Sequence, residues 1–102
     1  MKINIGSMKY ELVKDSSKPE EECSEIALGS ANYLDATITV LSGLDKQVVK
    51  QTLWHEIVHV MLNEIGKDKL NNDEGFVDAL AKQIYSVLEN NNLEKIYKEI
   101  ET

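Results

Sequence analysis

The chain carries, at residues 54–60, the stretch Trp54-His55-Glu56-Ile57-Val58-His59-Val60. These seven residues include both histidines of the sequence, four positions apart. They lie within Gln47 to Ile65, a segment without proline or glycine, so the sequence predicts one uninterrupted helix there. Residues four apart share one face of a helix. His55 and His59 are therefore predicted to point at a single metal ion.

The rest of this helix favours a metal over an ordinary polar face. Asp45 is a typical N-cap, Gly66 is a typical C-terminal stop, and the residues around the histidines are apolar. Imidazole and carboxylate groups suit such surroundings only if something neutralises their polarity. Neutral imidazole is a good zinc ligand, and Glu56 would lie where it can take a proton from bound water. A chance occurrence of the motif in an ordinary helix is the alternative.

A second helix is predicted from Glu74 to about Glu89, capped by Asp73 or Asn72. A carboxylate in its first turn, Glu74, can bind the metal as a third ligand. Asp78 lies one turn later on the same side and can accept the free N–H of a ligating histidine. In the alternative, both are ordinary acidic residues stabilised by the helix dipole. The core stripe expected for this helix is Val77, Leu80, Ile84, Val87 and Leu88.

Taken together, His55-Glu56-x-x-His59 and Glu74-x-x-x-Asp78 resemble the pattern of the glutamate-zincins. The stretch from Thr52 to His59 is similar to the start of the zinc helix in the ImmA/IrrE family, small metallopeptidases of phages and mobile elements. This resemblance implies zinc bound by His55, His59 and Glu74, with Glu56 as the general base and Asp78 orienting a ligand. It also implies that the substrate is a protein or peptide. A phage or mobile-element regulator is one candidate for that substrate. The helix-turn-helix segment of better-known members is not found here, so a regulatory role is not implied.

Peptide hydrolysis at such a site needs a further donor for the oxyanion. The sequence has no third histidine and no arginine. Tyr33, Tyr85, a lysine or a backbone N–H could serve. We favour Tyr33, because the turn that contains it could lie over the metal, whereas Tyr85 lies about 16 Å beyond Glu74 along the helix. Ordinary aromatic packing is the alternative for Tyr33.

Composition limits the other functions. The 102 residues suit a single domain, residues 1–102, with 42% apolar and 28% charged residues. A net charge of −7 without arginine argues against a nucleic-acid partner. No run approaches the roughly 20 apolar residues of a membrane span, so no membrane partner is expected. The lone cysteine, Cys23, and the absence of a signal-like run suggest the cytoplasm.

The expected fold class is α+β: a small antiparallel sheet, then two long helices carrying the zincin-like site, then a short C-terminal helix. The expected strands are Lys2–Ile5, Lys9–Val13, Glu25–Leu28 and Ala36–Leu41. Their expected connections are a Gly6-Ser7 turn, an acidic loop over Asp15–Glu22 and a turn over Gly29–Asp35. The C-terminal helix is expected over Leu93–Ile100.

Two other classes of function stay open. The first is a non-catalytic zinc-binding or protein-interaction domain that retains the zincin fold. The second is a helical interaction module without metal. The presence of Glu56 argues for the enzyme, because a purely structural zinc site has no need of a base.

Overall fold

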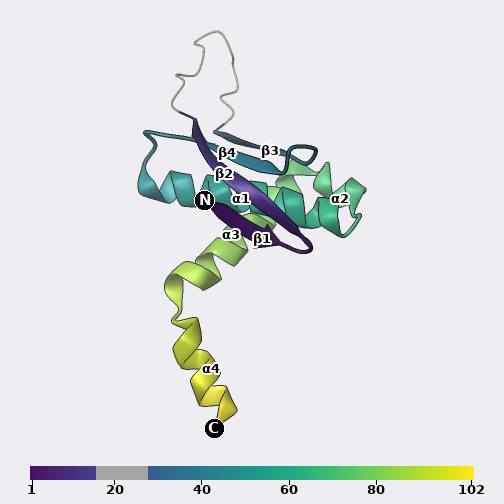
Figure 1. Cartoon of the computed structure of the whole chain (residues 1–102). Helices are drawn as coiled ribbons and strands as arrows, with labels where there is room; N and C mark the ends of the chain where they lie inside the picture. Colours follow the sequence, from purple (N-terminus) through teal and green to yellow (C-terminus); the bar gives the residue numbers. More distant parts are fainter. Residues whose placement is uncertain (16–27) are drawn as a thin grey trace.

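The computed structural model describes residues 1–15 and 28–102. One sheet with strand order β1-β2-β4-β3 contains β1 (Lys2–Ile5), β2 (Met8–Asp15), β3 (Gly29–Asn32) and β4 (Thr37–Leu41). The helices are α1 (Lys46–Glu64), α2 (Asp68–Asn71), α3 (Glu74–Asn90) and α4 (Leu93–Glu101). Helix α1 runs along one face of the sheet, and α4 extends away from the body (Figure 1). The α+β class and the short C-terminal helix are confirmed.

The direction of one strand pair differs from the expectation. β1 pairs with β2, and β3 with β4, in antiparallel fashion. β2 and β4 run parallel, with Leu12 opposite Ile38. The sheet is therefore mixed rather than wholly antiparallel. The reason is topological: β3 occupies the outer edge, and β4 returns between β3 and β2, in the same direction as β2.

The edge strand β3 lies where the sequence predicted a turn. Glycine and serine have low strand propensity, but close packing against α1 determines the strand here. A Cβ atom added to Gly29 would lie 2.8 Å from Thr52 Cγ2 and 3.4 Å from Glu56 Cγ. The true turn covers residues 33–36. Three sequence features fall almost entirely outside the described residues: the predicted strand Glu25–Leu28, the acidic loop Asp15–Glu22 and Cys23. Of these residues, the structure describes only Leu28, which is not in a strand, and Asp15, which ends β2.

The predicted hairpin turn at Gly6-Ser7 is present and is joined to the end of α1. Gly6 has φ +59°, the left-handed conformation that this turn needs at its first position. The Ser7 backbone N–H and hydroxyl both donate to Glu64 Oε1, at 2.9 and 2.5 Å. These two bonds hold the Glu64 pKa below its usual value. The first hairpin is thus fixed relative to the C-terminal end of α1.

The helix boundaries follow the predicted caps. The Asp45 side chain accepts from Gln47 N at 2.9 Å, and Asp73 Oδ1 accepts from Phe76 N at 3.0 Å. Helix α2 was not expected, because four residues are too few to produce a recognisable period in the sequence. It lies between α1 and α3 and positions Asn71 beside His59.

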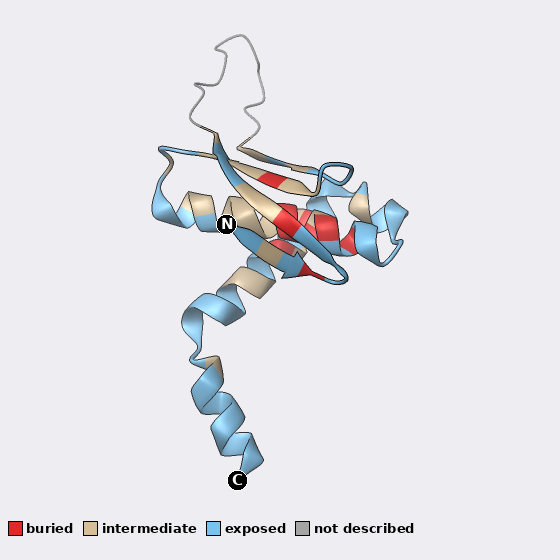
Figure 2. Ribbon diagram, in the orientation of Figure 1, coloured by how far each residue is buried: buried red, intermediate tan, exposed pale blue. Residues whose placement is uncertain are grey.

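Helix α1 carries several of the buried residues and lies against the sheet (Figure 2). Ile57 and Val60 pack against the sheet, in one cluster with Ile38 of β4, which is fully buried. Val58 and Leu62 pack against α3. The third face, which carries both histidines, is therefore directed toward neither of these apolar clusters.

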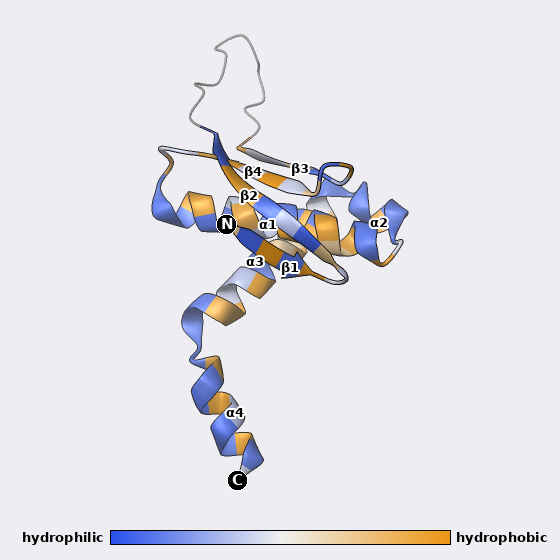
Figure 3. Ribbon diagram, in the orientation of Figure 1, coloured by the Kyte–Doolittle hydropathy of each residue, from blue (hydrophilic) through white to orange (hydrophobic). Residues whose placement is uncertain are grey.

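The core ends partway along α3. Val77 is fully buried, and Leu80 and Ile84 pack against the α1–α3 cluster, but Val87 and Leu88 are exposed. The predicted core stripe is thus wrong in its last turn, because no element of the described chain covers Val87 and Leu88. Apolar bands continue onto α4, which has no buried residue (Figure 3). None of the helices in the described part of the chain is long and apolar enough to cross a membrane.

Candidate metal centre

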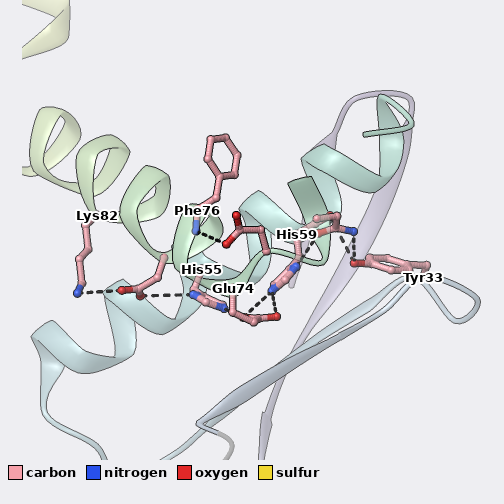
Figure 4. Close-up of polar contacts among 9 residues, drawn as sticks. Tyr33, His55, His59, Glu74, Phe76 and Lys82 are labelled. Atoms are coloured by element: carbon pink, nitrogen blue, oxygen red, sulfur yellow. Dashed lines mark hydrogen bonds and ion pairs between the residues drawn. The ribbon is translucent and has the colours of Figure 1, made fainter. Parts of the chain in front are cut away.

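Three side chains predicted as metal ligands come together between α1 and α3. His55 Nε2 lies 3.1 Å from Glu74 Oε2, and His59 Nε2 lies 3.1 Å from Glu74 Oε1 (Figure 4). The two imidazole rings are 4.9 Å apart between centroids. One donor atom from each of the three side chains falls within 4.8 Å of the others, so the cluster can hold a metal ion.

The geometry and chemistry of the donors suit zinc. Tetrahedral zinc with bonds of about 2.0–2.1 Å has ligand atoms roughly 3.3 Å apart. The nitrogen–oxygen separations of 3.1–3.3 Å between the histidines and Glu74 are close to this value. The imidazoles are largely sheltered, with side-chain exposures of 23% for His55 and 13% for His59, whereas Glu74 is 69% exposed. An ion could therefore be reached from solvent on the Glu74 side.

Glu56 lines the same groove as the three candidate ligands. It is the one charged residue of the described chain that is buried, at 8% exposure. Burial raises its pKa, an effect that His55 and His59 partly offset and that the charge of Glu74 reinforces. A carboxylate with a raised pKa binds a proton more strongly, which suits the predicted role of general base.

His59 has an orienting partner that the sequence did not reveal. Its Nδ1 lies 2.6 Å from Asn71 Oδ1. Since an amide oxygen can only accept, Nδ1 is the donor in this contact, and Nε2, which faces Glu74, is the nitrogen that would bind a metal ion. Asn71 belongs to α2, and no motif spacing points to it. Its role depends on the unexpected short helix that positions it.

Asp78, predicted to orient a ligand, approaches the other histidine. Its Oδ1 lies 3.6 Å from His55 Nδ1, in the right place but longer than a hydrogen bond. Its Oδ2 accepts a 2.9 Å bond from Lys82, which is the main reason that the Asp78 pKa lies below its ordinary value. Asp78 thus faces His55 as an ionised carboxylate held by Lys82.

Tyr33 lies on the β3–β4 turn at the edge of the site. Its hydroxyl accepts a 3.0 Å bond from Asn71 Nδ2 and donates a 3.4 Å bond to the His59 backbone carbonyl. Tyr33 also lines the groove. Its hydroxyl proton is directed at α1, and the oxyanion role of Tyr33 stays a prediction. Tyr85 is not among the residues that line the groove.

The groove has a volume of about 660 Å³ and contains the whole candidate site. Its wall opposite α3 is β3, the edge strand of the sheet. Leu41 N donates to the Leu28 carbonyl at 2.9 Å, and bonding residues alternate along an antiparallel pair. The N–H and C=O of Gly29 and Ala31 therefore point away from β4, on the side of β3 that pairs with no described strand.

Comparison with protein-family models, with curated proteins and with solved structures finds no match for this chain. What can be said of its chemistry therefore depends on the residues and geometry above.

Exchange of Asn71 for alanine is expected to weaken metal binding by about 10–100-fold, because His59 loses the acceptor that fixes its tautomer and ring orientation. Competition with a chromophoric chelator measures this affinity. The matched control is Asn72→Ala at the neighbouring, exposed position. Equal affinities for the two variants would contradict the orienting role of Asn71.

Proposed function

We propose that the protein is a zinc-dependent metallopeptidase of the glutamate-zincin type, similar to the ImmA/IrrE peptidases. One observation supports this most strongly: His55, His59 and Glu74 converge in a groove that also contains the buried carboxylate of Glu56. A structural metal site would usually be closed by a fourth protein ligand and would not need this base. The ligand set leaves a position for water.

In the proposed reaction, zinc supplies Lewis acidity toward the scissile carbonyl and lowers the pKa of water. His55, His59 and Glu74 hold the ion, and Asn71 keeps the His59 proton on Nδ1. Glu56 takes the proton from the attacking water and can transfer it to the departing amine. Tyr33, Lys82 and backbone N–H groups are the candidates for stabilising the oxyanion, since all belong to the groove wall.

The proposed substrate is an extended protein or peptide segment. The side of β3 that pairs with no described strand offers the backbone groups of Gly29 and Ala31, and an added strand would place a peptide bond close to the metal ligands. We place the protein in the cytoplasm, with a phage or mobile-element regulator as one possible substrate. Neither nucleic acid nor membrane is part of this proposal.

A non-catalytic zinc-binding or protein-interaction domain is the second candidate. The observation in its favour is that the Tyr33 hydroxyl donates to the His59 carbonyl and not into the groove. Without an oxyanion donor, a peptide could bind along β3 and remain uncleaved. A hydrolysis assay separates the two candidates.

Metal removal tests the proposed activity. The full chain, loaded with one equivalent of zinc, is incubated with a synthetic peptide mixture of varied sequence, and new termini are detected by mass spectrometry. We expect cleavage that stops on chelation and returns when zinc is restored. Stoichiometric zinc without cleavage would favour the non-catalytic candidate, and failure to bind zinc would refute both.

A further inference from the structure

At the His59 end of the groove, the β3–β4 turn, which carries the lining residue Tyr33, contacts helix α2. Tyr33 belongs to the β3–β4 turn and Asn71 to α2, yet Asn71 Nδ2 lies 3.0 Å from the Tyr33 hydroxyl. The same hydroxyl reaches the His59 carbonyl on α1 at 3.4 Å. Three segments distant in sequence thus meet at the His59 end of the site (Figure 4). An extended chain cannot pass here unless these bonds break.

At the opposite end, beyond His55, the described residues form no comparable closure. Its wall residues include Leu28, Val48, Gln51 and Lys82. Lys82 is bonded to Asp78 on its own helix, not to the sheet. Among the hydrogen bonds and ion pairs found between described residues, none joins β3 to α3 there. As formed by residues 1–15 and 28–102, the groove is therefore asymmetric, open beyond His55 and blocked beyond His59.

The direction of β3 gives this asymmetry a chemical meaning. The strand runs from Gly29 toward Tyr33, so its C-terminal end lies at the blocked side. Antiparallel pairing is slightly more stable per residue than parallel pairing. A peptide added antiparallel to β3 would therefore have its amino-terminal part at Tyr33 and its carboxyl-terminal part in the open end.

We propose that Tyr33, held by Asn71, limits the site to peptide bonds near a free amino end of the substrate. This inference depends on the proposed peptidase function and adds its substrate class. The space between the metal ligands and the Tyr33–Asn71 contact is short, because Asn71 Oδ1 lies 2.6 Å from the ring of His59, itself a candidate ligand.

The test compares where substrates are cut, not only how fast. A peptide that the wild-type enzyme cleaves is also prepared with a glycine-serine extension at its amino end, and products are identified by mass spectrometry. For the wild type we expect short amino-terminal products. We expect the extension to slow cleavage at the original bond by about tenfold or more, equivalent to ~1.4 kcal/mol of lost transition-state binding.

Tyr33→Ala removes the barrier, and we expect it to cut the extended peptide at the original, now internal, bond. Tyr33→Phe keeps the ring without its two hydrogen bonds, so it should show a weaker shift in the same direction. Tyr97→Ala, at an exposed position on α4, is the matched control and should retain the wild-type product pattern. Thermal melting of each variant with zinc establishes that it is folded.

Two results would overturn the inference in distinguishable ways. If the wild type cuts internal bonds of the extended peptide as readily as Tyr33→Ala does, the barrier is absent although the peptidase proposal stands. If no variant cuts any peptide, the peptidase proposal fails and the barrier with it. Slower cleavage at unchanged positions in Tyr33→Phe and Tyr33→Ala would instead assign Tyr33 to the oxyanion and refute the barrier.

Discussion

Replacement of Glu56 by glutamine is expected to abolish detectable hydrolysis while metal binding is retained. Glutamine keeps the size of the side chain but cannot accept the proton of the attacking water. A positioned general base contributes about 10²–10⁴-fold to such a rate. The metal should remain, because Glu56 is not one of the three residues whose donor atoms converge. Zinc content and kcat/KM, measured on the same preparation, check both halves of this expectation.

Glu101→Gln is a suitable control, since it makes the same chemical change at an exposed position at the end of α4. It should behave as the wild type in both measurements. Because Glu56 is buried, its exchange could also alter packing, so the melting temperatures of the metal-free proteins are compared. Unimpaired cleavage by Glu56→Gln would show that another group removes the proton.

Exchange of His59 for alanine is expected to remove stoichiometric zinc and the stability that zinc provides. A ligand that binds only the folded state at 100 times its dissociation constant adds about 2.7 kcal/mol. We therefore expect zinc to raise the melting temperature of the wild type and not that of His59→Ala. The same should hold for Glu74→Ala. Calorimetry with and without zinc measures the difference.

The comparison with Asp78→Ala makes this prediction specific. Asp78 lies 3.6 Å from His55 Nδ1 and is held by Lys82, so its loss should weaken zinc affinity by only about 10–100-fold. Zinc at a higher concentration should again raise the melting temperature of the Asp78→Ala protein. If Asp78→Ala abolished binding while Glu74→Ala retained it, the third ligand would have to be reassigned to Asp78.

Features that depend on nearby residues were predictable from the sequence. The limits of α1 follow from Asp45 and Gly66, and those of α3 from Asp73, because each cap acts within a few residues. The convergence of His55 with His59 follows from the period of one helix. Glu74 was found because it begins the next helix. These are local relations, which helical geometry fixes once the helix is recognised.

Features that depend on distant packing were not predictable. Strand β3 contains Gly29 and Ser30, whose low strand propensity is outweighed by contact with α1. The parallel pairing of β2 with β4 is a property of chain topology and leaves no periodic signal. Asn71 orients His59 only because α2 places it there. In each case the deciding partner lies far along the chain or in an element too short to show a pattern.

The positions of the three ligands have a consequence for how the chain folds. His55, His59 and Glu74 lie within 20 consecutive residues, whereas the strand pairing of residues 11 and 37 must close a longer loop. Loop-closure entropy grows with the length of chain enclosed, so the ligand-bearing helices can meet before the sheet is complete. Zinc captured at that point would hold α1 and α3 together as a nucleus. The strands that form the substrate wall would then assemble on a metal site already in place.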